Sequence, residues 1–210
     1  FNGRWRGGFA IQNLGPKIKY DEGGRENFLP TNLRLGGGFD FIFDQYNRVN
    51  VTAEVTKLLV PTPPVTGKEY NYTDTNGDGV YNPDDGDVRG TLVGNVILEG
   101  QDPDVGFMSG VFQSFNDAPG GFSEELDEFT WALGAEYVYQ DSFAFRLGYF
   151  NENEFKGARK FFAMGAGFKY TAINIDLSYL ISASKVQSPL ENTLRFSLSV
   201  NFGDGEYSEY

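Results

Sequence analysis

The sequence predicts an all-β protein, a transmembrane antiparallel β-barrel, and three observations support this fold class. Apolar and polar residues alternate over eight segments, each about as long as the 9–11 residues that a tilted strand needs to cross a bilayer. The composition is rich in Phe (20), Tyr (12) and Gly (27), which is typical of strands joined by tight turns. Short and long connections between these segments alternate along the chain, as in outer-membrane barrels.

The alternation is clearest near the C-terminus, in residues 192–202. Leu194, Phe196, Leu198, Val200 and Phe202 fall on one face, and the residues between them are polar or charged. Because successive strand residues point to opposite faces, this spacing predicts a two-faced strand. The same pattern, weakest in the first range, predicts strands in 4–14, 33–43, 49–56, 129–139, 143–149, 162–170 and 173–181.

The two faces of these strands differ in chemistry. The apolar face carries Phe, Tyr and Trp near the strand ends, as in interfacial aromatic girdles. A soluble β-sandwich, with the apolar face as its core, is the alternative structure. The polar face carries charges of both signs, which suits a wet or salt-bridged lumen: Arg34, Asp40, Glu54, Glu136, Arg146, Lys169, Asp176 and Arg195.

The connections predict the orientation of the barrel. Residues 44–47, 140–142 and 171–172 are short, whereas 15–30, 59–127, 152–159 and 182–191 are longer. If 192–202 ends in the periplasm, every short turn is periplasmic and every long loop is extracellular. We therefore expect one outer-membrane barrel domain over 1–210. It would contain a long acidic extracellular insertion at 60–126 and a C-terminal periplasmic tail at 203–210.

Composition and charge exclude several classes of function. The chain has no His and no Cys, which excludes His-dependent catalysis, disulfides and Cys-ligated metals, and no enzyme motif is present. The net charge is −12, and 14 acidic against two basic residues lie in 61–128, so nucleic acid is not an expected partner. No apolar run is long enough for a transmembrane helix. No signal peptide precedes Phe1, so we expect a chain that is mature, truncated or incompletely seen at its N-terminus.

The acidic insertion contains a calcium-loop pattern in residues 74–85. Oxygen-bearing side chains occupy loop positions 1, 3 and 5, a Gly follows at position 6, and a carboxylate closes the loop at position 12. The final ligand is Asp rather than Glu, and Pro83 argues against an exit helix. An acidic turn without metal is the alternative. The candidate Ca²⁺ ligands are Asp74, Asn76, Asp78, Val80 (through its carbonyl), Asn82 (through a water) and Asp85.

A short helix is predicted after this loop. Met108, Val111, Phe112 and Phe115 follow helical spacing, Asp104 is a candidate N-cap, and the residues 116–121 end the helix. The helix either packs over the mouth of the barrel or presents these four residues to a protein partner.

Three segments resemble the PorV family, outer-membrane components of the type IX secretion system. They are residues 29–36 (LPTNLRLG), 117–126 (DAPGGFSEEL) and 188–196 (SPLENTLRF). The resemblance implies a FadL-like barrel of fourteen strands, of which this chain would supply the C-terminal eight, and no enzymatic activity. It also implies a shuttle that takes the C-terminal secretion domain of cargo from the SprA-type translocon barrel to PorU-like attachment machinery.

Two other functions remain open. A FadL-like outer-membrane transporter of hydrophobic small molecules would need an apolar ligand pocket in the lumen. A stand-alone eight-stranded barrel would need segment 4–14 to pair with segment 192–202.

Overall fold

The computed structural model describes residues 2–186 and 189–201. The expected C-terminal tail, 203–210, lies outside these residues. The chain divides into two units. The sheet unit consists of Phe1–Leu14, Pro30–Leu58 and Asp127–Tyr210, and the loop unit consists of Gly15–Leu29 and Leu59–Leu126.

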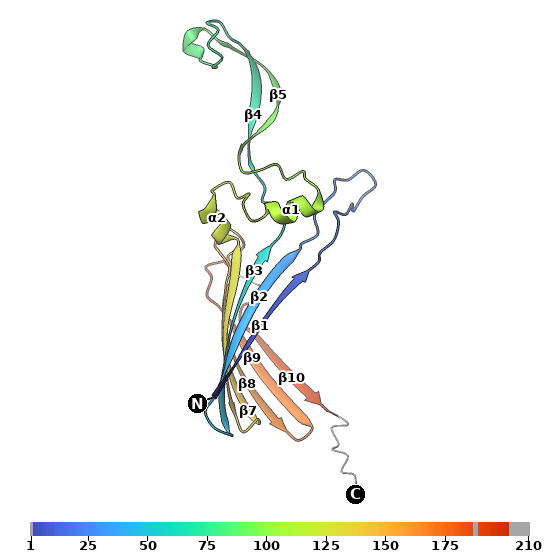
Figure 1. Ribbon diagram of the computed structural model, residues 1–210, viewed down its shortest axis with the longest axis vertical. Coiled ribbons are helices and arrows are strands. Elements are labelled where there is room, and N and C mark those ends of the chain that lie inside the picture. Colours follow the sequence, from blue (N-terminus) through green and yellow to red (C-terminus); the bar gives the residue numbers. More distant parts are fainter. Residues whose placement is uncertain (1, 187–188, 202–210) are drawn as a thin grey trace. The chain divides into compact units, whose positions relative to one another are not determined.

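The sheet unit contains one eight-stranded sheet in which every neighbouring pair is antiparallel (Figure 1). All eight predicted strands are present, with ends that differ from the expected ones by a few residues. They form one sheet rather than two packed sheets, so the β-sandwich alternative is wrong for this part of the chain. In spatial order the strands are β1 (Asn2–Gln12), β2 (Asn32–Ile42), β3 (Asn47–Leu58), β6 (Phe129–Tyr139), β7 (Phe143–Asn151), β8 (Lys160–Tyr170), β9 (Ile173–Ser182) and β10 (Thr193–Val200).

The strand register keeps the two predicted faces separate across the sheet. Between β6 and β7, Ala135 lies opposite Leu147, and Glu136 lies opposite Arg146. Because paired residues point to the same side, apolar residues meet apolar ones and charged residues meet charged ones. The three short connections lie at one end of the sheet and the long ones at the other, as predicted.

The sheet is open within the described residues. β1 and β10 are its two edges and do not pair with each other. The all-β class is confirmed, but the closed barrel is not observed. The stand-alone barrel that requires 4–14 to pair with 192–202 is likewise not formed.

The loop unit holds the remaining elements. β4 (Val65–Thr73) and β5 (Val88–Glu99) form a two-stranded ribbon, with a 3-10 turn, η1 (Pro83–Asp85), in its tip. Two helices follow, α1 (Phe107–Gln113) and α2 (Phe122–Asp127), the second of which runs to the boundary with the sheet unit. The ribbon does not follow from the sequence pattern, because the apolar residues of β5 are consecutive and its register is interrupted by bulges.

Helix α1 is shorter than the predicted one and begins differently. Its N-cap is Gly106, which has no side chain to donate or accept a capping bond. Asp104 is therefore not the cap, and its carboxylate instead accepts a hydrogen bond from Lys17 Nζ at 3.4 Å. Within the described residues, neither helix has the length and apolar character needed to span a bilayer.

Candidate functional site

The apolar face of the sheet is exposed rather than covered. Trp5 at the β1 edge is 83% exposed and Leu147 in β7 is 66% exposed. The described chain buries few large hydrophobic side chains, so this face has no core behind it. An apolar surface of this extent marks contact with a membrane or another protein.

Aromatic side chains form two rows on this face. Near the long-loop end, Tyr149 lies 5.3 Å from Trp131 and 4.7 Å from Phe162, measured between ring centroids. Near the short-turn end, Phe143 and Phe168 lie 5.0 Å apart. Six residues separate the rows on β7 and on β8, which is about 20 Å along a strand at ~3.3 Å per residue. Aromatic girdles that flank an apolar band have this arrangement.

The polar face is crossed by ion pairs. Arg146 of β7 bonds to Glu136 of β6 and also reaches Asp176 of β9, across the intervening strand β8. Glycine at position 167 of β8 makes this reach possible, because a Cβ there would lie 2.7 Å from the Asp176 carboxylate and 3.1 Å from the Arg146 guanidinium. Arg6 pairs with Asp40 at 3.0 Å. The predicted salt-bridged face is thus present.

Ion pairs also fix the long-loop end of the sheet unit. The ammonium of Lys57, whose side chain is almost fully buried, lies 2.7 Å from Glu128, and Lys156 approaches the same carboxylate at 3.0 Å. In the loop between β7 and β8, Arg159 donates to both oxygens of Glu152 at 2.7 and 2.8 Å. This guanidinium lowers the pKa of the Glu152 carboxyl below its usual value.

The calcium-loop residues are folded into a tight turn at the tip of the ribbon. Both carboxylate oxygens of Asp74 accept backbone N–H groups, from Gly77 at 2.6 Å and Gly79 at 2.8 Å. The Asn76 amide donates to Asp78 at 3.0 Å and to Asp85 at 3.3 Å.

The Asn82 amide also donates to Asp85, at 2.8 Å. The Val80 side chain is exposed. The side chains of four candidate ligands, Asn76, Asp78, Asn82 and Asp85, are thus linked by hydrogen bonds from amide NH₂ groups to carboxylates, whereas Asp74 bonds to backbone N–H groups. The donor set fits Ca²⁺, which prefers carboxylate and carbonyl oxygens.

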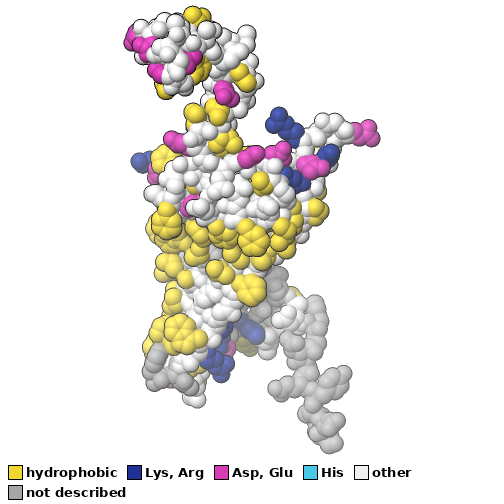
Figure 2. All heavy atoms as spheres, turned by 45° about the horizontal axis from the view of Figure 1, so that its top comes forward, with side chains coloured by type: hydrophobic (Ala, Val, Ile, Leu, Met, Phe, Trp, Pro, Cys, Tyr) yellow, Lys and Arg dark blue, Asp and Glu magenta, His cyan; other side chains and the backbone are white. Residues whose placement is uncertain are grey.

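A further residue, Asp87, stabilises the fold of this tip. It was not among the candidate ligands. Its carboxylate accepts the backbone N–H of Thr75 at 2.8 Å and of Asn82 at 3.0 Å. These two bonds lower the pKa of Asp87 below its ordinary value, and the bond from Asn82 has the larger effect. Figure 2 shows acidic side chains gathered at this tip.

Helix α1 presents three of its four predicted contact residues. Met108 and Phe112 of the helix and Phe115, which follows the C-cap Ser114, are exposed, whereas Val111 is buried. Val111 therefore anchors the helix, and the other three side chains are accessible to a partner.

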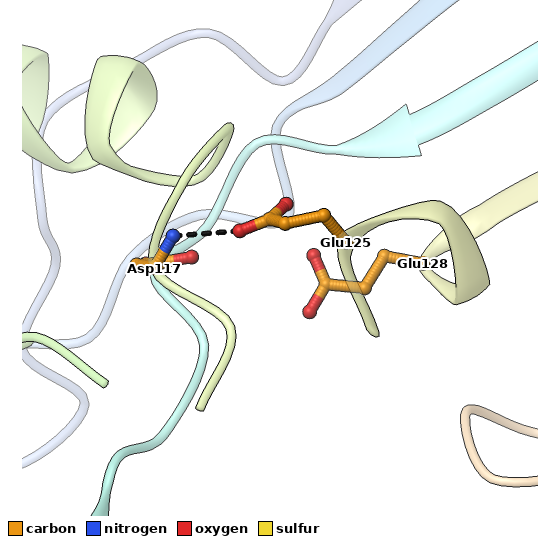
Figure 3. Close-up of side chains that lie close together, drawn as sticks. All are labelled: Asp117, Glu125 and Glu128. Atoms are coloured by element: carbon orange, nitrogen blue, oxygen red, sulfur yellow. Dashed lines mark hydrogen bonds between the residues drawn. The ribbon is translucent and has the colours of Figure 1, made fainter. Parts of the chain in front are cut away.

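Two buried carboxylates hold the segment between the helices. One oxygen of Glu125 accepts the backbone N–H groups of Asp117 at 2.6 Å and Ala118 at 2.9 Å (Figure 3). Asp117 in turn accepts the N–H of Thr62 at 2.9 Å. Asp117 and Glu125 both lie in the segment 117–126, whose resemblance to PorV was the only sequence signal for them.

The fold and these surfaces define an all-β protein with an eight-stranded sheet, which exposes an apolar face and carries ion pairs on its polar face, and with a structured acidic loop unit. Residues 1–65 match the family model of the type IX secretion system protein PorV. The match covers β1 to β3 and ends at the first residue of β4. The match bears out the resemblance to PorV within these residues, which include the first of the three segments that carried it, 29–36. No curated protein matches the chain.

Proposed function

We propose that this chain forms part of an outer-membrane β-barrel of the type IX secretion system. The observation that carries the proposal is the exposed apolar face between two aromatic rows, on a chain whose N-terminal part matches PorV. In a bilayer this face would be covered by lipid. Because unpaired backbone groups are costly in lipid, the open edges at β1 and β10 would be paired by further strands, as in a FadL-like barrel of fourteen strands.

Within that system, the protein acts as a non-enzymatic shuttle. It binds the C-terminal secretion domain of cargo leaving the SprA-type translocon and delivers it to the PorU-like cell-surface attachment complex. The long-loop end is the proposed contact region, including 59–127 and the described part of 182–191, because short turns occupy the other end. The exposed side chains of Met108, Phe112 and Phe115 supply an apolar contact there.

Affinity purification from detergent-solubilised outer membranes tests this function. Translocon and cargo are expected to co-purify with the full chain. Their absence, together with a bound fatty acid, would favour the FadL-like transporter instead. The charged polar face of the sheet speaks against an apolar ligand on that side.

We further propose that the ribbon tip binds Ca²⁺ and that the ion orders this loop. Asp85→Asn removes a terminal ligand charge, whereas Asp84→Asn, at the neighbouring position outside the ligand pattern, is the matched control. The measurement is terbium luminescence of the detergent-purified chain, with Ca²⁺ as the competitor. The parent and Asp84→Asn are expected to give a signal, and Asp85→Asn is expected to lose it. No signal from the parent would make the tip a metal-free acidic turn, and equal signals from all three would overturn the assignment of Asp85 as a ligand.

A further inference from the structure

The β4–β5 ribbon exposes apolar side chains on both of its faces. Val96 and Ile97 are consecutive and regularly paired, with Gly67 and Thr66 respectively, so they point to opposite faces. Each is 38% exposed. Half of β5 consists of exposed large apolar residues, namely Val88, Leu92, Val93, Val96, Ile97 and Leu98.

Such a strand is unusual in a two-stranded ribbon. Strands with apolar residues on both faces are typical of sheets that are covered on both sides. A two-stranded ribbon has no core of its own and is at best marginally stable in water. The composition of β5 therefore indicates that both faces of the ribbon are covered in its functional state.

The edges of the ribbon are poorly suited to adding another strand. Three register shifts interrupt the pairing, so that the twelve residues of β5 lie opposite only nine residues of β4. Bulges of this kind break the regular row of N–H and C=O groups and increase the twist. The contact is therefore made by side chains on the faces, rather than by backbone pairing at an edge.

The charge of the ribbon selects its partner. Residues 65–99 contain seven Asp and Glu but only Lys68 and Arg89 as bases. Arg89 is stacked on Tyr70, with its guanidinium 4.4 Å from the ring centroid. Figure 2 shows the acidic side chains at the tip of the ribbon and hydrophobic ones along its strands. A second copy of the ribbon, or an anionic lipid surface, would be repelled, whereas a basic protein surface would be attracted.

We infer that the β4–β5 ribbon inserts into an apolar cleft of a partner protein, with Lys and Arg in the part of that cleft that receives the tip. The cleft covers both faces of the ribbon, and its cations meet the acidic tip. The inference deepens the proposed function and rests on it only for the extracellular location of the ribbon. Apart from its first residue, Val65, the ribbon lies after the residues that match the PorV family model.

Photocrosslinking from both faces tests the insertion. Val96 and Ile97 are replaced one at a time by p-benzoylphenylalanine in the full chain in intact cells, and Tyr20, which is 74% exposed in the loop unit outside the ribbon, is the control position. Both ribbon positions are expected to give an adduct with the same partner. The crosslinked peptide should be apolar and flanked by Lys or Arg, and the adduct yield should fall severalfold at high salt, since surface charge attraction is screened.

Several results would overturn the inference. An adduct from only one face means a flat contact, and an adduct with another copy of the chain means self-association. Absence of adducts from both positions, or the same adduct at equal yield from Tyr20, removes the ribbon from partner binding.

The ends of the ribbon allow a second variant that separates this inference from the proposed function. A Cβ on Gly100 would lie 3.2 Å from the Cα of Pro64, so the chain enters and leaves the ribbon at nearly the same place. Residues 65–99 can therefore be replaced by a short Gly-Ser linker. Excision should abolish recovery of the crosslinked partner while the protein still reaches the membrane. If translocon and cargo co-purify but no adduct forms, only the ribbon inference fails. If the adduct forms but neither co-purifies, only the proposed function fails.

Discussion

At the scale of single residues, glycine decides how charges meet on the polar face. Gly167 leaves the space through which Arg146 reaches Asp176 across β8. Gly167→Val should displace the guanidinium and lower the free energy of unfolding by about 1–3 kcal/mol, the usual cost of overpacking. Heat-modifiability in detergent measures the loss.

Gly8→Ala on the same face is the matched control, because a Cβ at position 8 would have no atom within 4 Å. It should leave stability unchanged. Equal stability of Gly167→Val and Gly8→Ala would show that the ion pair across β8 contributes nothing measurable.

A second residue-scale prediction concerns pH and the ribbon tip. Because backbone N–H groups of Asn82 and Thr75 lower the pKa of Asp87, its contribution to tip order is present above the ordinary carboxyl value of 3.8. It is lost as the pH falls through the lower folded-state pKa. Hydrogen exchange of peptides covering 74–87, corrected for intrinsic pH dependence, should therefore remain slow at pH 5 and accelerate below pH 3.8.

At neutral pH, Asp87→Asn should accelerate the same exchange, since one carboxylate acceptor is replaced by an NH₂ group. Asp84→Asn, whose carboxylate lies outside this pair of bonds, is the control and should exchange like the parent. Slow exchange in Asp87→Asn would mean that other contacts hold the tip.

At the scale of elements, α1 and the residues just after it carry an exposed apolar surface of the loop unit. Changing Met108, Phe112 and Phe115 together to Ser should reduce cargo capture by about tenfold or more, because clustered apolar anchors carry most of the energy of an interface. Buried Val111 is kept, so the helix retains its anchor. Co-purified cargo per inserted protein is the measurement.

Phe122→Ser is the control for this helix, since Phe122 is exposed on α2 rather than α1. It should capture cargo normally. Normal capture by the triple variant would exclude α1 from the mechanism.

At the scale of the whole molecule, the two faces of the sheet should respond oppositely to charge. Phe196→Arg places a cation on the apolar face and should cost about 2–4 kcal/mol if that face meets lipid near the bilayer centre. Ser197→Arg, the next residue in β10, places it on the polar face opposite Asp176, where it should be tolerated. Urea unfolding in lipid vesicles compares them. Equal stability would contradict a lipid-facing sheet.

The same scale shows which parts of the fold were predictable. The eight strands of the sheet followed from period-two alternation, because each has one apolar face and one polar face along its length. The β4–β5 ribbon did not, because β5 has apolar residues on both faces and bulges that shift its pairing. The cap of α1 was also wrong, since Asp104 pairs with Lys17 from a distant segment.

By itself, the sequence determined the strand positions, their two chemistries, the alternation of short and long connections, and the resemblance to PorV, because these depend on neighbouring residues or on local spacing. The tertiary structure decided which residues meet across the chain: Arg146 with Asp176 over Gly167, Glu125 with the backbone of residues 117 and 118, and Asp87 with both sides of the ribbon tip. Such contacts depend on register and on loop closure, which no local pattern encodes.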